Sequence, residues 1–232
     1  MKIKFVSPSF KIRTSLNPLR ILKHLEKAGR TCYQSEKKIT NDSCEKFIKG
    51  IINRGHESVL EHFSFSVVFT CSRAISHQIV RHRLCSFSEQ SQRYCRFGSK
   101  VQLQVIIPHW IPEQDKEFLL KLSTYNIGPI DDIYENFQNL STETLLWFHT
   151  IANSVDSYEG LLEAGFKPEE ARSVLPKSIK TEIVVSANLR AWRHILKLRT
   201  SPAADSEMRE LMIPFLKELK TKLPIIFDDI EV

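Results

Sequence analysis

The sequence lacks any hydrophobic run long enough to cross a membrane. A transmembrane helix needs about 18 or more consecutive apolar residues, and no such stretch occurs. Residues 1–13 also lack the apolar core that a signal peptide carries. We therefore expect a cytoplasmic protein with no membrane partner.

Cysteine is scarce, and its spacing favours neither cross-links nor metal binding. The chain has 5 cysteines, an odd number, and no pair is separated by two residues. Free, mostly buried thiols are expected rather than a disulfide framework. His56 and His62 lie six positions apart, as do Cys71 and His77, and neither spacing fits a compact zinc site. We expect no bound metal.

Glycine and proline are also few, at 7 and 10 of 232 residues, which leaves little room for linkers. A chain of this length suits one domain with a full hydrophobic core. We expect a single domain over residues 1–232. Its sheet core would cover about 1–112 and 177–187, and its helical part about 113–176 and 188–232.

Basic residues are in mild excess. Lysine and arginine number 33 against 27 acidic residues, which gives a formal net charge of +6. Such an excess suits an anionic partner, but it does not choose among a nucleotide, a cofactor phosphate and a nucleic acid.

The hydrophobic patterns predict an α+β fold. It consists of a small central, mostly antiparallel sheet with flanking helices and a helical C-terminal subdomain. Alternating apolar residues and β-rich runs predict strands, whereas apolar residues three and four apart predict helices. The expected strands are 63–71, 101–107 and 181–187. The expected helices are 17–29 with Gly29 as its stop, 73–83 capped by Ser72, 188–200 capped by Asn188, and 44–54, 168–176, 205–221 and 113–163, the last with a break at Gly128-Pro129.

A basic cluster, Arg81-His82-Arg83, stands at the end of one expected helix. Guanidinium groups bind phosphates and planar anions through paired hydrogen bonds. The alternative is a solvated basic helix end that complements the helix dipole. On a helix, Gln78 would share a side with Arg81 and His82. A dense polar run over 86–93 follows, in which the carboxylate of Glu89 stands among arginines and can accept hydrogen bonds.

The cluster and the polar run together resemble the signature of the flavin-dependent thymidylate synthases. That signature is Arg-His-Arg, seven residues, Ser, one residue and Arg, which reads here as 81–83, Ser91 and Arg93. Four further blocks resemble family segments in the same order along the chain. They are GRTCYQS (29–35), GHESVLEH (55–62), ARSVLP (171–176) and NLRAWRHILKLR (188–199).

The resemblance implies a reaction and its partners. Family members methylate dUMP to dTMP, with 5,10-methylenetetrahydrofolate as the carbon donor and reduced FAD as the hydride source. NADPH normally reduces the flavin. Members are homotetramers whose FAD sites are shared between subunits. We expect the same here, with no nucleic acid partner.

The resemblance also implies which residues bind which ligand. His56 would lie on the folate side, and Arg199 would activate the uracil by stabilising negative charge on it. The positions expected to bind FAD are Ser58, Arg81, His82, Arg83, Glu89, Asn188, Leu189, Arg190 and His194. The positions expected to bind dUMP are Gln78, Ile79, Val80, Arg81, Glu89, Gln90, Ser91, Gln92, Arg93, Arg172 and Arg199.

Three positions have an alternative role or depart from the family pattern. Ser91 is expected to contact ligand rather than act as a nucleophile, because its neighbours cannot readily accept its proton. His194 alone could be an ordinary surface histidine, on a helix where Ile195 and Leu198 are expected to face the core. Asp205 stands where many members carry Gln, which puts the contacts at that position in doubt.

Two other functions stay open from the sequence. A nucleic-acid-binding module would place the basic cluster on phosphates, but such modules interleave aromatic residues on the same surface. Here Phe63, Phe65 and Phe69 belong to a strand pattern expected in the core. A non-catalytic flavin-binding protein of the same fold is the second alternative.

Overall fold

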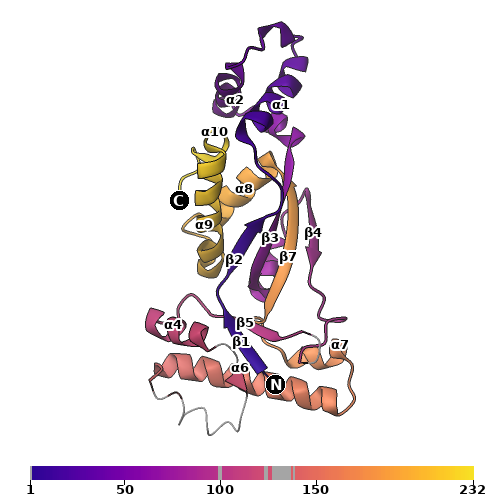
Figure 1. Ribbon diagram of the computed structural model, residues 1–232, viewed down its shortest axis with the longest axis vertical. Helices are drawn as coiled ribbons and strands as arrows, with labels where there is room; N and C mark the ends of the chain where they lie inside the picture. Colours follow the sequence, from indigo (N-terminus) through magenta and orange to yellow (C-terminus); the bar gives the residue numbers. More distant parts are fainter. Residues whose placement is uncertain (1, 99–100, 123–124, 127–136, 138) are drawn as a thin grey trace. The chain divides into compact units, whose positions relative to one another are not determined.

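The computed structural model describes residues 2–98, 101–122, 125–126, 137 and 139–232 (Figure 1). Its helices, antiparallel sheet and parallel strand pair confirm the α+β class. The chain forms two compact units. The first comprises residues 1–9, 70–79 and 89–183, and the second comprises 10–69, 80–88 and 184–232. The sequence-based division of the chain into a sheet core and a helical part remains a prediction.

The first unit contains a three-stranded sheet in the order β5-β1-β6. β1 (Lys2–Val6) pairs in parallel with β5 (Leu103–Ile106) and antiparallel with β6 (Tyr125–Asn126). Alternation in β1 buries Ile3 and Phe5, so one face of the strand enters the core. β1 was not predicted from the sequence.

Helices complete the first unit. Phe5 packs on Phe148 of α6, with ring centroids 5.4 Å apart. The helical pattern predicted over 113–163 appears in two described pieces, and its expected break at Gly128-Pro129 lies outside the described residues. The helices are α3 (Arg73–Ile79), α4 (Glu113–Lys121), α6 (Thr142–Glu163), α7 (Pro168–Ala171) and the short 3-10 helix η3 (Arg172–Val174).

α3 is shorter than the helix predicted over 73–83. Its predicted cap is confirmed, because Ser72 Oγ accepts a hydrogen bond of 3.2 Å from the Ile75 amide. The helix ends at Ile79, however, and Leu84 takes a φ of +61°, in the left-handed region where a helix cannot continue. The expectation that Gln78 shares a helix face with Arg81 is therefore wrong.

A four-stranded antiparallel sheet has the order β2-β3-β7-β4. The expected strands around 63–71 and 181–187 are confirmed as β3 and β7. β4 lies inside the signature, in a segment for which only a polar run, and no strand, was predicted. The bounds are β2 (Ser9–Ile12), β3 (Ser64–Ser72), β4 (Cys85–Glu89) and β7 (Lys180–Asn188).

Aromatic residues form the core of the second unit. Trp192 stacks on Phe65 with ring centroids 5.1 Å apart and meets Phe215 edge-on at 5.4 Å. The indole N–H of Trp192 donates to the Phe65 carbonyl over 3.3 Å, which satisfies its buried donor. Phe65 and Phe69 are thus buried and are not offered to a nucleic acid for stacking.

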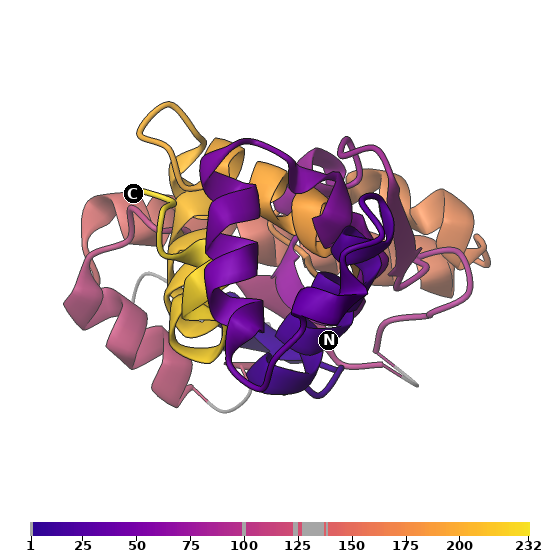
Figure 2. The ribbon, with the colours of Figure 1, turned by 90° about the horizontal axis from the view of Figure 1, so that it is seen from above.

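The helices of the second unit pack on one another. α1 packs on α2, and α10 packs on both α2 and α9 (Figure 2). No helix among the described residues combines the length and the apolar character needed to cross a membrane. The helices are α1 (Pro18–Thr31), α2 (Ser43–Asn53), α8 (Leu189–Arg199), α9 (Ser206–Lys222), α10 (Pro224–Phe227) and the 3-10 helices η1 (Glu36–Lys38) and η2 (Glu57–His62).

Gly29 does not end the first helix, as the sequence had suggested. It lies inside α1, which continues to Thr31. A Cβ atom at Gly29 would stand 2.8 Å from the ring of Phe47 on α2. The glycine is there because the two helices approach closely, not because the helix terminates.

Candidate functional site

A cavity of about 640 Å³ in the second unit collects residues from three segments. They are η2, the turn after Val80, and α8. Seven of the residues predicted to bind ligand line it, which are Arg81, His82, Arg83, Asn188, Arg190, His194 and Arg199. The remaining lining residues are Glu57, Glu61, Leu84, Ala191, Ile195 and Leu198.

α8 presents its residues to the cavity because its start is fixed. Asn188 ends β7 and caps the helix, with its side-chain oxygen accepting from the Ala191 amide over 2.8 Å. Arg190 and His194 then stand one turn apart, as the sequence predicted. Ile195 is buried as expected, whereas Leu198 is 48% exposed and lines the cavity instead of the core.

Arg199 and His82 meet inside the cavity. The Nε–H group of Arg199 donates a hydrogen bond to Nε2 of His82 over 2.9 Å. The ring of His194 stands edge-on to that of His82, with centroids 6.2 Å apart. One helix thus supplies two groups that hold a histidine from a segment more than a hundred residues earlier.

The electrostatics make His82 a neutral acceptor. Burial, followed by the nearby charges of Arg199 and His194, lowers the pKa of His82 to about 4. The side chain is therefore uncharged near neutral pH and can accept the proton that Arg199 donates. Burial and then the charge of Arg81 also lower the pKa of Arg199 below its usual value, but a guanidinium remains charged in proteins.

The acidic residues of the cavity wall are already paired with bases of α8. Glu61 accepts from Arg190 over 2.6 Å, and Glu57 lies 3.8 Å from Lys197. Arg81 and Arg83 have no carboxylate partner within the described part of the chain. The turn therefore brings uncompensated positive charge to the cavity.

Leu84 occupies an unusual position in that turn. It is 85% exposed and has a φ of +61°, a conformation that costs a non-glycine residue roughly 1–3 kcal/mol. Its side chain lines the cavity. Strain of this kind collects at ligand sites, where the fold holds a residue in place for contact rather than for stability.

A buried arginine behind the cavity was not predicted from the sequence. Arg193 is 1% exposed and holds Asp229 through two bonds of 2.6 and 2.7 Å. Its Nε–H group donates to Glu57 over 3.1 Å, and it also contacts the carbonyl of Ile226. Arg193 thus ties the wall of the cavity to the C-terminal segment of the chain.

In the first unit, Glu89 is paired rather than alone among arginines. Its carboxylate accepts a 2.9 Å bond from Arg73, whose guanidinium also reaches the Gln90 carbonyl and the Thr181 hydroxyl. The Gln90 amide donates to the Glu182 carbonyl over 2.9 Å, so β4 passes directly into the predicted dUMP-binding segment. Arg73 is a partner that the sequence analysis did not identify.

The first unit also brings together two arginines that are distant in sequence. Arg93 Nε lies 3.3 Å from a Glu169 carboxylate oxygen, and Arg172 Nε donates to the Glu169 carbonyl over 3.3 Å. Ser91 Oγ accepts from the Arg93 amide over 3.2 Å, which makes this serine part of a turn. No base lies against the hydroxyl in the bonds described for it.

The other predicted positions differ in exposure. His56, Ser58 and Val80 are exposed, and Gln78 and Gln92 are half-buried. Ile79 and Leu189 are buried. None of these seven residues lines the 640 Å³ cavity. In the described residues, no cluster of three His, Cys, Asp or Glu side chains could hold a metal ion.

Comparisons with known proteins show the family of this chain. A family model described as "Thymidylate synthase complementing protein" matches residues 20–225. The flavin-dependent thymidylate synthase of Mycobacterium avium is 35% identical over 213 residues, which cover 90% of this chain and 79% of that protein. The Mycobacterium marinum enzyme of the same name is 36% identical over 211 residues, with the same coverage.

A solved structure supports the fold. The UMP/dUMP methylase PolB from Streptomyces cacaoi, with 5-Br UMP bound, superposes with a TM-score of 0.71. The match covers 97% of this chain and 95% of that one at 20% identity, which is evidence for the fold alone. With the family model spanning most of the sequence and relatives above 30% identity, this chain belongs to the flavin-dependent thymidylate synthase family.

Proposed function

We propose that this chain methylates dUMP to dTMP, with 5,10-methylenetetrahydrofolate as the carbon donor and FAD, reduced by NADPH, as the hydride carrier. One observation carries the proposal. Residues from the signature segment 81–83 and from α8 line a single cavity, and Arg199 is fixed there by the neutral His82. Family membership supplies the reaction class.

The cavity has the chemistry that FAD requires. Its volume of about 640 Å³ lies in the range of cofactor and ligand sites. Arg81 and Arg83 supply positive charge without carboxylate partners in the described residues, which suits a diphosphate. Leu84, Ile195 and Leu198 supply apolar wall for a planar ring. When bound, the flavin provides the hydride that a protein side chain cannot.

The protein's own groups would bind and orient the two ligands and polarise the uracil. We propose that Arg81 and Arg83 bind the phosphates of FAD. The rest of the cofactor would be bound by Asn188, Arg190 and His194. Arg199 would face the uracil, where its charge stabilises negative charge that develops on the ring oxygen and nitrogen. A fixed guanidinium does this better than a mobile one, because no reorganisation is needed during the reaction.

The nucleotide phosphate would be bound by residues of the first unit. Arg93 and Arg172 both reach Glu169, so two guanidinium groups converge at one place within that unit. Two arginines suit a phosphate dianion. We propose that the backbone and side chains of Gln90, Ser91 and Gln92 hold the sugar and base beside them, with Ser91 as a hydrogen-bonding group.

The remaining proposals concern the other partners and the assembly. Three neighbouring residues, Gln78, Ile79 and Val80, would contact dUMP. Leu189 would contact FAD, and Glu89 would contact both FAD and dUMP. His56 and Ser58 are exposed and are candidates for the folate side and the flavin. The assembly would be a cytoplasmic homotetramer in which subunits share the FAD sites.

The test combines a spectrum with a turnover assay. The purified protein should show flavin absorption bands and convert dUMP to dTMP with folate and NADPH. An Arg199→Ala variant should keep the flavin bands and lose turnover by about a hundredfold or more, the scale of a removed electrostatic stabiliser. Lys197→Ala removes a cation from the same helix turn outside the cavity and should retain both. Colourless protein that never takes up FAD would refute the proposal.

A further inference from the structure

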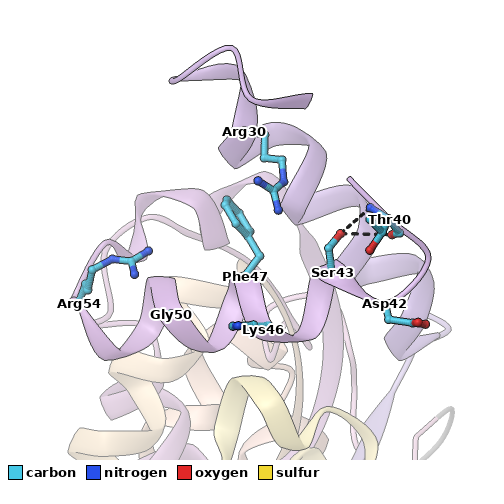
Figure 3. Close-up of a pocket in the computed structure, with 8 residues that line it drawn as sticks. All are labelled: Arg30, Thr40, Asp42, Ser43, Lys46, Phe47, Gly50 and Arg54. Atoms are coloured by element: carbon cyan, nitrogen blue, oxygen red, sulfur yellow. Dashed lines mark hydrogen bonds between the residues drawn. The ribbon is translucent and has the colours of Figure 1, made fainter. Parts of the chain in front are cut away.

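A second cavity in the second unit has no part in the proposed reaction. It measures about 460 Å³ and is formed by one face of α2 and the end of α1 (Figure 3). Its lining residues are Arg30, Thr40, Asp42, Ser43, Lys46, Phe47, Gly50 and Arg54. None of them lines the 640 Å³ cavity.

The α2 residues of this cavity share one face because of their spacing. Ser43, Lys46, Phe47 and Gly50 are separated by three, four and seven positions, and Arg54 follows one turn later. Because Gly50 has no side chain, the surface is recessed at the centre of that face. A Cβ atom there would stand 3.2 Å from Nη1 of Arg54, which shows that the guanidinium folds back over the glycine.

Arg30 is held rigidly at the edge of the cavity. Its Nε and Nη2 atoms bond Glu26, a buried carboxylate on the same helix, over 2.8 and 2.6 Å. The Ser43 hydroxyl lies 2.9 Å from the other carboxylate oxygen. The guanidinium stands over the ring of Phe47, with its carbon 4.6 Å from the centroid. Its position is therefore fixed before any ligand arrives.

Two further cations at the cavity are uncompensated. Lys46 and Arg54 form no ion pair with any residue that the structure describes. The one exposed carboxylate of the lining, Asp42, points away from Phe47 and Arg30 (Figure 3). Lys46 and Arg54 line the same cavity, so an anion bound in it would offset the positive charge of both.

We infer that this cavity binds the phosphate or diphosphate group of a small ligand at Arg30, Lys46 and Arg54. Two guanidinium groups and an ammonium group can engage several phosphate oxygens at once. The Thr40 hydroxyl is a further polar group in the lining. Phe47 is covered on one face by Arg30, so the site recognises the charged group of the ligand rather than a stacked ring.

The binding test uses pyrophosphate as the probe and the full chain as purified. Isothermal titration calorimetry should detect binding, and Lys46→Gln and Arg54→Gln should each weaken it at least tenfold. Both side chains are exposed, so neither change disturbs the core. Lys49→Gln is the matched control, because it removes the same charge from α2 at a residue outside this cavity. Its affinity should stay within about twofold of the original.

Three results would overturn the inference. They are the absence of pyrophosphate binding, an equal loss in all three variants, and a signal that persists in Lys46→Gln and Arg54→Gln but disappears in Arg81→Gln. The last result would place the probe in the 640 Å³ cavity. Orthophosphate run in parallel distinguishes a site for a single phosphate from one that needs a diphosphate. The assay measures neither flavin binding nor turnover, so its outcome is separate from that of the proposed reaction.

Discussion

The Nε–H group of Arg199 donates to Nε2 of a buried, neutral His82 over 2.9 Å. The bond requires an unprotonated imidazole, because a protonated ring has no lone pair to offer. Burial supplies that condition by disfavouring the charged form of the ring. The orientation of the guanidinium in the cavity therefore depends on the protonation state of one histidine.

Stability should fall in mild acid because of His82. Its pKa is about 4 in the folded chain, whereas an unfolded chain takes up this proton near pH 6.5. Between these values the unfolded state binds more protons, so the free energy of unfolding decreases as the pH decreases. The group contributes a loss of up to about 3 kcal/mol from pH 7 to pH 4. Urea denaturation across this range measures it.

His82→Gln is the control for this pH dependence. The amide oxygen of glutamine can still accept a bond from Arg199, but the side chain does not titrate. The variant should lose less stability than the original chain between pH 6.5 and pH 4. If both proteins show the same dependence, the acid sensitivity comes from other groups.

Removal of the buried Arg193 should cost more than removal of an exposed arginine on the same helix. Arg193→Met removes the buried partner of Asp229 and Glu57 and leaves Glu57 only its 3.8 Å pair with Lys197, so we expect a loss of about 2–3 kcal/mol. Arg190→Met breaks one exposed pair with Glu61 and should cost less than about 1 kcal/mol. Urea midpoints of the two variants give the comparison. Equal losses would mean that the buried network adds nothing beyond a surface ion pair.

Local chemistry made much of the fold readable from the sequence. The caps at Ser72 and Asn188 fixed the starts of two helices, and the alternating residues of β3 fixed a strand, because these signals act within a few residues. The signature and α8 likewise predicted most of the cationic lining of the cavity. These features depend on the identity of a residue and its near neighbours.

Other features depend on contacts between distant segments and could not be read in this way. Gly29 was taken for a helix stop because its real cause, the ring of Phe47, comes from another helix. The pairing of Glu89 with Arg73 and of Glu57 with Arg193 arises only when strands and helices pack. Carboxylates seen in isolation along the chain gave no sign of these partners.

Asp205 has a structural role at the start of α9. Its carboxylate caps α9, with a 2.9 Å bond from the Glu207 amide and a 3.4 Å bond from the Met208 amide. Asp205→Ala should lower the free energy of unfolding by about 1 kcal/mol, the usual cost of a lost cap. Asp205→Asn keeps an accepting oxygen and should cost only a few tenths of that amount. Thermal unfolding of both variants tests this, and equal losses would contradict the capping role.

Two glycine-to-alanine changes should have opposite effects, because only one of the glycines has a close neighbour. Gly160 lies within α6 with no atom within 4 Å of an added Cβ, so Gly160→Ala should stabilise the protein by about 0.5–1 kcal/mol. At Gly29 the same gain is outweighed by the clash with Phe47 at 2.8 Å, and we expect a net loss of about 1 kcal/mol. Denaturant midpoints distinguish the signs. In a Phe47→Leu background the ring is absent, so Gly29→Ala should lower the free energy of unfolding much less than it does in the original chain. A penalty that stays unchanged in that background would show that Phe47 does not require the glycine.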